Sequence, residues 1–315
     1  MNLEVIILAA GQGTRMKSPL PKVLHPVAGR PMLQHVVETA RALQAKAIHV
    51  VVGHGAEQVR AALDDPGLTW VTQEQQLGTG HAVLQAMPAV QPDSTVLILY
   101  GDVPLISAST LENLVAVAVS APALLTAKVA KPAGYGRILR DEAGALVGVV
   151  EHKDASDSQL LIDEINSGVL AAPASDLQQY LPAIKNQNSQ GEYYLPDVLA
   201  MAVADGKAVA SCMAESELEI QGVNDRVQLH QVEREFQRLQ AEQLMRAGVS
   251  LADGSRLDVR GVLHCGVDVS IDVNVVLEGA VTLGDGVSIG PNCVLRDVTV
   301  GEGATIHAMS HLQEA

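Results

Sequence analysis

The last quarter of the chain repeats its hydrophobic positions every six residues. Apolar residues stand six apart, and a second series, mostly valine, lies two places before each of them. The two series are Ile271, Leu277, Leu283, Ile289 and Leu295, and Val269, Val275, Val281, Val287 and Cys293. After a slip of one residue the period resumes at Val300, Ile306 and Leu312. A six-residue repeat with turn pairs such as Asp285-Gly286 is typical of a parallel β-helix of either hand.

The repeat is still running at Ala315. We therefore expect the chain to be the front part of a longer protein. Any activity that resides in later turns of the coil would then lie outside it.

The first two thirds of the chain alternate short apolar runs with segments of helical spacing. Val5–Ala10, His49–Val52, Val96–Tyr100 and Leu124–Val129 fit buried parallel strands, and Val36–Leu43, Ala56–Leu63 and Leu111–Val119 fit helices. This alternation predicts a doubly wound, Rossmann-like α/β sheet. Ligands of such sheets bind beyond the carboxyl ends of the strands, which directs attention to the residues after Ala10, Val71 and Tyr100.

A segment of a different kind joins the two patterns. Asp225–Ala247 is rich in Gln, Glu and Arg, lacks Gly and Pro, and carries apolar residues at helical spacing. It predicts a long amphipathic helix that ends at Gly248. The expected organisation is a first domain at 1–224, a linker helix at 225–249 and a partial coil at 250–315.

Bulk composition excludes several classes of protein. The net charge of −15 over 315 residues argues against nonspecific nucleic-acid binding. No apolar run is long enough to span a membrane and the N-terminus has no signal-peptide layout, so the expected location is the cytoplasm. Cys212, Cys265 and Cys293 are too few and too scattered for a disulfide framework or a metal cluster, and we expect reduced structural thiols.

The charge is unevenly distributed near the N-terminus. No acidic residue lies between Glu4 and Glu38, yet Arg15, Lys17, Lys22 and Arg30 fall there. A locally cationic stretch on an acidic protein suggests a site for a small anion. A solvated basic surface would produce the same pattern.

The first strand runs directly into a glycine-bearing loop, Gly11-Gln12-Gly13-Thr14-Arg15. Glycines let backbone amides approach an anion, and the guanidinium of Arg15 suits phosphate oxygens. Lys22 follows at a distance that could fold back over the same pocket. A dinucleotide fingerprint would need glycine at Met16, and a P-loop would need a Gly-Lys-Ser/Thr ending, so neither motif is present. A plain strand-to-helix turn remains the alternative.

Two further segments could carry chemistry. Asp102 follows the apolar strand that ends at Tyr100-Gly101, where a carboxylate is well placed to ligate Mg²⁺ or, alternatively, to cap a turn. Gln73 and the turn 76–80 carry amide and hydroxyl groups that suit hydrogen bonds to a nucleobase.

In this order, the segments from Leu8 to Met16, Pro21-Lys22, Leu77-Gly78-Thr79-Gly80-His81 and Tyr100-Gly101-Asp102 resemble those of the sugar-nucleotide pyrophosphorylases. The closer resemblance is to the bacterial bifunctional N-acetylglucosamine-1-phosphate uridyltransferase/glucosamine-1-phosphate N-acetyltransferases. It also rests on segments 134–138, 151–154, 164–168, 191–194 and 222–224, and on the hexad coil behind them. The resemblance covers essentially the whole chain in order, and it implies that the hexad coil is the start of a left-handed parallel β-helix.

This resemblance implies synthesis of UDP-N-acetylglucosamine from UTP and N-acetylglucosamine 1-phosphate, with Mg²⁺ as the cofactor, for cell-wall and lipopolysaccharide precursors. It assigns the uridine to Leu8, Ala9, Ala10, Gly11, Gln73, Gly78 and Thr79, and the phosphates and catalysis to Arg15 and Lys22. It assigns further substrate contacts to Tyr100 and Gly101, Mg²⁺ to Asp102 and Asn224, and the amino sugar to Gly136, Glu151 and Asn166. Without the resemblance, Glu151 and Asn166 would be interpreted as an exposed carboxylate and a turn asparagine.

The chain departs from the family's pattern in two places. Gln12 stands where some relatives carry lysine, which removes one possible phosphate contact. The family's acetyltransferase residues belong to later coils, so we expect acetyl-CoA to be used only by the full-length enzyme and this chain to transfer uridylyl but not acetyl groups.

Two other functions fit part of the pattern. A glucose-1-phosphate nucleotidyltransferase shares the glycine loop with Thr14 and Arg15. Alternatively, the chain serves mainly as a trimerisation scaffold, because an open hexad coil usually buries a face against symmetry mates. We expect an enzyme domain on a stem that forms a homotrimer.

Overall fold

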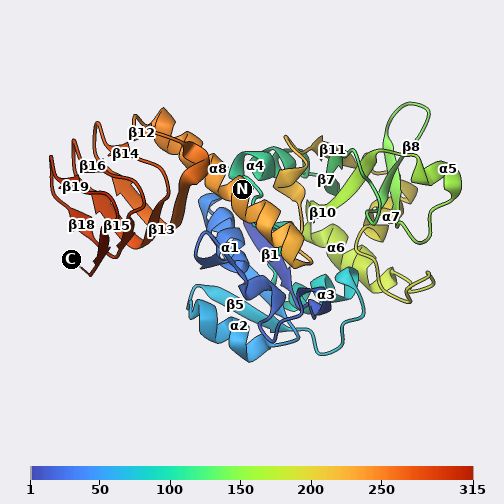
Figure 1. Ribbon diagram of the computed structural model, residues 1–315. Coiled ribbons are helices and arrows are strands. Elements are labelled where there is room, and N and C mark those ends of the chain that lie inside the picture. Colours follow the sequence, from blue (N-terminus) through green and yellow to red (C-terminus); the bar gives the residue numbers. More distant parts are fainter. Residues whose placement is uncertain (1, 315) are drawn as a thin grey trace. The chain divides into compact units, whose positions relative to one another are not determined.

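The structure, a computed structural model, describes residues 2–314 and divides the chain into two compact units (Figure 1). One unit comprises the chain up to Leu24 together with Met32–Asp225. The other comprises His25–Pro31 and the chain from Arg226 onward. The sequence-based boundary at residue 224 did not anticipate that His25–Pro31 groups with the C-terminal part. The three-domain division itself stays a prediction.

The segment His25–Pro31 is a tight hairpin within the second unit. Strands β2 (Pro26–Val27) and β3 (Arg30–Pro31) pair in antiparallel fashion. The backbone N–H of Ala28 donates to Glu233 Oε2 at 2.6 Å. Gly29 has φ +78°, and a Cβ there would lie 2.9 Å from the backbone of Arg260. These contacts are between residues far apart in sequence, so no local pattern predicts them.

A nine-stranded mixed sheet forms the centre of the first unit. Along the sheet the order is β11-β7-β10-β6-β1-β4-β5, and the hairpin β8-β9 extends from β10. The strands are β1 (Leu3–Ala9), β4 (Ala47–Val52), β5 (Leu68–Thr72), β6 (Thr95–Tyr100), β7 (Ala123–Lys128), β8 (Arg137–Arg140), β9 (Leu146–Val150), β10 (Glu164–Pro173) and β11 (Ala210–Met213).

The predicted doubly wound α/β architecture is confirmed, with one addition. The apolar runs assigned as strands are β1, β4, β6 and β7, and β1 pairs in parallel with both β4 and β6. Strand β10, however, lies between β6 and β7 and is antiparallel to both. The chain leaves β7 through the β8-β9 hairpin instead of a helical crossover, and a hairpin connection permits this antiparallel return.

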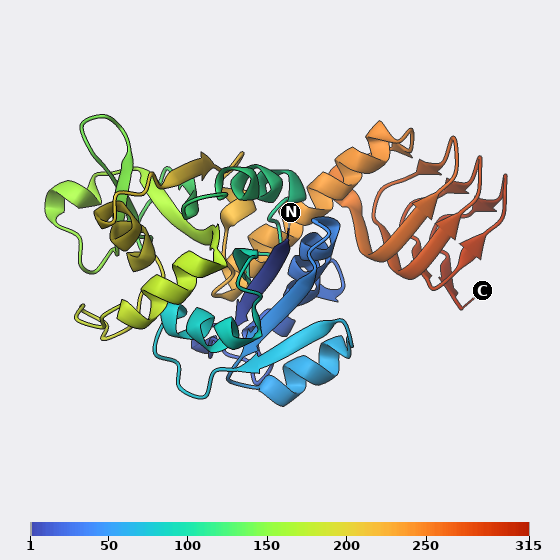
Figure 2. The same cartoon turned by 180° about the vertical axis from the view of Figure 1, so that it is seen from behind.

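Helices cover both faces of this sheet (Figures 1 and 2). They are α1 (Met32–Ala42), α2 (Ala56–Leu63), α3 (Thr79–Ala86), α4 (Ala108–Val117), α5 (Asp157–Leu160), α6 (Ala174–Tyr180) and α7 (Asp197–Ala204). The expected helices correspond to α1, α2 and α4. Successive residues of β1 point to opposite faces, so Val5 and Ile7 join one hydrophobic cluster and Ile6 and Leu8 join the other.

The second unit carries the predicted linker helix, α8 (Arg226–Arg246), and the predicted parallel β-coil. The coil strands are β12 (Ser250–Leu251), β13 (Leu257–Cys265), β14 (Ser270–Ile271), β15 (Val275–Leu283), β16 (Ser288–Ile289), β17 (Val294–Arg296), β18 (Thr299–Val300), β19 (Thr305–Ile306) and β20 (His311–Gln313). Both apolar series named from the hexad pattern are buried.

The register of the coil contains the one-residue slip. Leu257 pairs with Val275, which is three hexads further along the chain. Thr282 pairs with Thr299, one residue short of three hexads. Asp297 lies in this shortened turn with φ +50°, and its Oδ1 accepts a hydrogen bond from the N–H of Ala280 at 2.9 Å. A side-chain acceptor thus takes the place of a ladder bond where the repeat loses one residue.

The first turn of the coil is closed by a side chain of α8. The amide of Gln237 donates to the backbone oxygen of Val259 and accepts from its N–H, each at 2.8 Å. Gln237 is 3% exposed. It therefore satisfies both backbone groups of a residue on the terminal β13 strand, as another strand would.

Across residues 2–314, no helix is both long enough and apolar enough to cross a membrane. The three cysteines are free thiols, and Cys293 is buried in the coil.

Candidate active site

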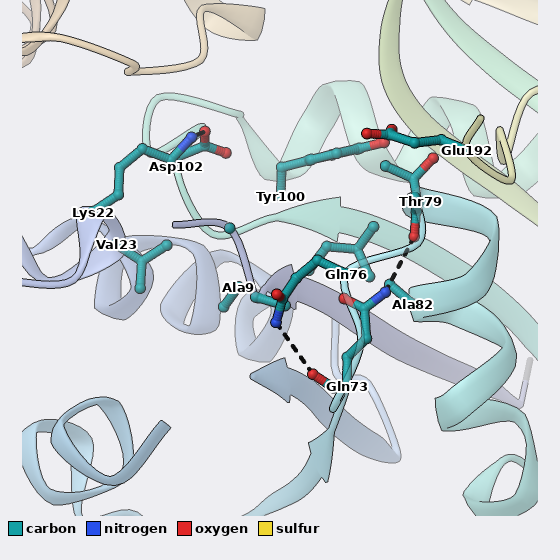
Figure 3. A pocket seen from close by; sticks show the side chains of 14 residues that line it. Ala9, Lys22, Val23, Gln73, Gln76, Thr79, Ala82, Tyr100, Asp102 and Glu192 are labelled. Atoms are coloured by element: carbon teal, nitrogen blue, oxygen red, sulfur yellow. Dashed lines mark hydrogen bonds and ion pairs between the residues drawn. The ribbon is translucent and has the colours of Figure 1, made fainter. Parts of the chain in front are cut away.

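A cavity of about 230 Å³ lies where β1 and β6 end (Figure 3). Ten of the residues expected at the site line it: Leu8, Ala9, Ala10, Gly11, Lys22, Gln73, Gly78, Thr79, Tyr100 and Asp102. This position is the carboxyl edge of parallel strands, where ligands of α/β sheets bind.

The glycine loop shapes one side of the cavity. Gly13 has φ +62°, and a Cβ there would lie 2.6 Å from Cβ of Lys22. Glycine is therefore required for Lys22 to fold back over the loop. Arg15 lies on the short 3₁₀ turn Thr14–Met16, and its side chain is exposed and does not line the cavity.

Lys22, Asp102 and Asn224 meet at one end of the cavity, although they come from widely separated parts of the chain. The ammonium of Lys22 forms an ion pair with Asp102 and donates to Asn224 Oδ1 at 3.2 Å. The N–H of Val223 donates to the backbone oxygen of Asp102 at 2.9 Å, which holds the segment containing Asn224 in place.

The oxygens of Asp102 and Asn224 fit a divalent cation. They converge on one positive group, the Lys22 ammonium, so the space between them already suits a cation. One carboxylate and one amide oxygen are a small set, but Mg²⁺ typically takes one or two carboxylates and completes its shell with water and phosphate. In the described part of the chain, no three His, Cys, Asp or Glu side chains are grouped to hold a metal by themselves.

Gln73 and the loop before α3 form the opposite wall. Gln73 is 3% exposed, and its Nε2 donates to the backbone oxygen of Gly78 at 3.2 Å. Gly78 has φ +112°, and a Cβ there would lie 2.6 Å from the backbone oxygen of Tyr193. The Oγ1 of Thr79 accepts from the N–H of Leu195 at 3.1 Å. The segment 193–195 therefore buttresses this wall.

Tyr100 lies between these two walls at the end of β6. Gly168 has φ +88°, and a Cβ there would lie 2.7 Å from the Tyr100 ring. Burial raises the pKa of Tyr100, and the charges of Glu151 and Asp102 raise it further. The side chain therefore stays a neutral phenol.

Gly136, Glu151 and Asn166 lie together near β8, β9 and β10, but none of them lines this cavity. Glu151 instead lines a second cavity, of about 380 Å³, together with Asp154 and Asp197. The N–H of Asn166 donates to the backbone oxygen of Gly136 at 2.9 Å, and a Cβ on Gly136 would lie 3.0 Å from Glu151 Oε1. The pairing of β10 with β7 shifts register between Asn166 and Leu170, a bulge of the kind that often re-aims side chains beside active sites.

Glu151 is electrostatically unusual. Burial raises its pKa first, and the neighbouring charges of Asp154, Asp197 and Glu192 add to this, while a hydrogen bond with Asn166 lowers it. A half-buried carboxylate that faces other carboxylates is a strong acceptor for ligand hydroxyl groups.

The residues expected at the site and the residues that line the cavity differ in both directions. Gly101 packs against Leu33, and its N–H donates to the backbone oxygen of Leu8, so it closes the sheet edge instead of lining the cavity. The sequence assigned no role to three residues that do line it, Val23, Ala82 and Glu192, and it named Gln76, which also lines it, only as part of the turn 76–80. Gln76 stands in the same glutamine-rich turn as Gln73, which was the available signal. No local pattern connects Glu192 with this cavity.

Comparisons with known proteins agree with this geometry. The MobA-like NTP transferase domain family matches residues 5–161. The chain is 56% identical over 314 residues to the bifunctional protein GlmU of Marinobacter nauticus, covering 99% of this chain and 69% of that protein. It is 58% identical over 316 residues to the GlmU protein of Azotobacter vinelandii, covering 100% of this chain and 69% of that protein.

The fold itself recurs in a solved structure of low sequence identity. A nucleotidyl transferase from Methanothermobacter thermautotroptrophicus matches with a TM-score of 0.54 and 23% identity. The match covers 75% of this chain and 98% of the other. It supports the nucleotidyltransferase fold.

Proposed function

The chain belongs to the GlmU family, and from this we propose that its first unit makes UDP-N-acetylglucosamine from UTP and N-acetylglucosamine 1-phosphate, releasing pyrophosphate. The observation that carries the proposal is the arrangement around Tyr100. A cationic and metal-competent group lies on one side, and groups suited to a nucleobase and to sugar hydroxyls lie on the others.

The proposed reaction is an in-line displacement. A phosphate oxygen of the sugar phosphate attacks the α-phosphorus of UTP, and the bond from that phosphorus to the bridging oxygen breaks as pyrophosphate leaves. The attacking oxygen is already anionic, so no general base is needed. The main barrier is electrostatic repulsion between two polyanions, and positioning supplies much of the remaining rate enhancement.

Lys22 and Arg15 are the proposed phosphate contacts. In the structure Lys22 is paired with Asp102, and we propose that it turns to the phosphates when they bind. Arg15 is exposed on the glycine loop, from which its guanidinium would approach the triphosphate. Both would offset negative charge that develops on the leaving pyrophosphate.

Mg²⁺ is the proposed metal, held by Asp102 and Asn224, and when bound it would neutralise and orient the phosphate oxygens. Removing divalent ions with a chelator should abolish pyrophosphate release, and adding back Mg²⁺ should restore it. Full activity in excess chelator would exclude this role.

The ligand groups divide between base and sugar. Backbone groups of Leu8–Gly11 with Gln73, Gly78 and Thr79 would hold the uridine. Gly136, Glu151 and Asn166 would hold the amino sugar, with Glu151 accepting hydroxyl protons and Asn166 supplying an amide. Tyr100 would contact substrate between them, whereas Gly101, which does not line the cavity, would support the strand end from which Tyr100 extends.

A pyrophosphate-release assay tests this proposal. UTP and dTTP are each supplied with a panel of sugar 1-phosphates that includes N-acetylglucosamine 1-phosphate and glucose 1-phosphate. Turnover is expected with UTP and N-acetylglucosamine 1-phosphate. Release seen only with glucose 1-phosphate or only with dTTP would replace the proposed substrates and favour the related glucose-1-phosphate nucleotidyltransferase.

We also propose that the protein is a homotrimer in the cytoplasm. The coil exposes large apolar side chains, with Val267 at 73% and Met309 at 79% exposure, and open coils bury such surface by association. UTP is an intracellular nucleotide, which supports the location. Molar mass measured against concentration, with and without residues 250–315, tests the assembly. A concentration-independent monomer would refute it.

A further inference from the structure

We propose that His81 is a positioning residue that fixes the side-chain amide of Gln73 so that its oxygen faces the base, which makes the site select uracil over cytosine. This inference rests on the proposed uridine site and adds a residue to it. His81 does not line the cavity and acts only through Gln73.

The argument starts from one backbone group. The amide of Gln73 lies 3.2 Å from the carbonyl oxygen of Gly78, measured from Nε2. A carbonyl oxygen only accepts hydrogen bonds, so the end of the amide that faces it must be the NH₂ group. A dashed line from the side-chain amide of Gln73 in Figure 3 marks this contact.

The same NH₂ group constrains the histidine. Gln73 Nε2 lies 3.0 Å from His81 Nδ1. Because Nε2 of Gln73 donates, Nδ1 must be the unprotonated, accepting nitrogen of a neutral imidazole, and the ring proton must be on Nε2. His81 Nε2 lies 3.3 Å from Gln85 Nε2. Since an amide NH₂ group only donates, the Gln85 amide must turn over by 180° so that its oxygen accepts the ring proton.

The local fold holds His81 in this position. It is in the first turn of α3, directly after Thr79 and Gly80, and the N–H of Gly80 donates to the backbone oxygen of Tyr193 at 2.8 Å. The ring also stands against Tyr193, with centroids 6.4 Å apart. Its Nδ1 therefore stays directed at Gln73.

The consequence for the ligand follows from the geometry of an amide. With both donors of Gln73 used by Gly78 and His81, its oxygen is on the opposite edge, in the cavity wall. An acceptor there complements N3–H of uracil. In cytosine N3 is itself an acceptor, so the two lone pairs would face each other. A site that places an acceptor opposite a donor of one base discriminates strongly against a base that carries an acceptor at the same position.

Base selectivity of matched variants tests the proposal. His81→Leu removes the acceptor and places an apolar side chain at this position of the helix. His81→Asn retains one, because Asn Oδ1 occupies the place of Nδ1. The ratio of kcat/KM for UTP to that for CTP should fall about tenfold in His81→Leu, since the Gly78 contact alone then orients the amide. His81→Asn should stay within about threefold of wild type.

Gln85→Leu is the control on the same helix, and it leaves the Nδ1 contact untouched. In Gln85→Leu the ratio of kcat/KM for UTP to that for CTP should change far less than in His81→Leu. An equal fall in kcat/KM for UTP and CTP in His81→Leu would show a purely structural role and overturn the proposal. A UTP-to-CTP ratio in His81→Asn as low as that in His81→Leu would also overturn it. Absence of UTP turnover in the wild type would instead refute the proposed function.

A second measurement does not depend on turnover. Two-bond ¹H–¹⁵N spectra of the full chain labelled at histidine distinguish the two neutral tautomers and the charged ring. The His81 signal is assigned by its loss in His81→Asn. The expected state is the tautomer with the proton on Nε2. A proton on Nδ1 would overturn the inference whatever the kinetics show.

Discussion

Gln237→Leu should lower the free energy of unfolding of the second unit by about 2 kcal/mol. The side chain is 3% exposed and forms two hydrogen bonds of 2.8 Å with the backbone of Val259. Leucine has a similar volume but neither donor nor acceptor. The substitution would leave one N–H and one C=O on β13 without partners.

The magnitude follows from three contributions. Each buried backbone group left without a partner costs about 2 kcal/mol, so the pair costs about 4. Burying a leucine in place of the amide returns about 2 kcal/mol. For a unit of this size a net loss of about 2 kcal/mol lowers the melting midpoint by roughly 10 °C.

Two assays check this value. Calorimetry or circular dichroism gives the melting midpoint, and hydrogen exchange gives the protection of the Val259 amide, which should fall by about 30-fold. Gln243→Leu is the control, because Gln243 is on the same helix and exposed. If Gln237→Leu has the same melting midpoint as Gln243→Leu, and the Val259 amide exchanges at the wild-type rate, then Gln237 does not cap the coil.

Three predictions concern the proposed active site. Asp102→Asn should lower kcat/KM at least about 100-fold, because a hard cation prefers carboxylate oxygen, and wild-type kinetics would make Asp102 a turn residue only. Arg15→Ala should lower kcat about 100-fold with a smaller change in the KM for sugar phosphate, and the opposite split would place Arg15 in ground-state binding. Because burial and neighbouring carboxylates raise the pKa of Glu151, kcat/KM for sugar phosphate should fall on acidification at a pH above the ordinary glutamate range. The same upward shift in pKa means that the ionised Glu151 carboxylate destabilises the folded state at neutral pH. Glu151→Gln should therefore raise the melting midpoint at neutral pH and abolish the fall in kcat/KM on acidification. If that fall is unchanged in the variant, another group is responsible for it.

The sequence alone determined the elements whose patterns are local. Hexad spacing is local, and the two apolar series from Val269 to Leu295 form the buried interior of the coil. The one-residue slip is seen in the register, and beyond it Val300 is buried while Ile306 and Leu312 are partly buried. Short apolar runs gave β1, β4, β6 and β7, because strands buried on both faces must be apolar throughout. The position of the cavity followed as well, since the carboxyl ends of β1 and β6 meet at one edge of the sheet.

The tertiary structure decided what depends on contacts across long stretches of chain. The antiparallel insertion of β10, the grouping of His25–Pro31 with the C-terminal unit and the presence of Glu192 in the cavity wall all arise from residues distant in sequence. Hydrogen-bond direction belongs to the same class. That Gln73 donates to His81 depends on where Gly78 and α3 place a carbonyl oxygen and a ring nitrogen, and no periodicity or composition encodes those positions.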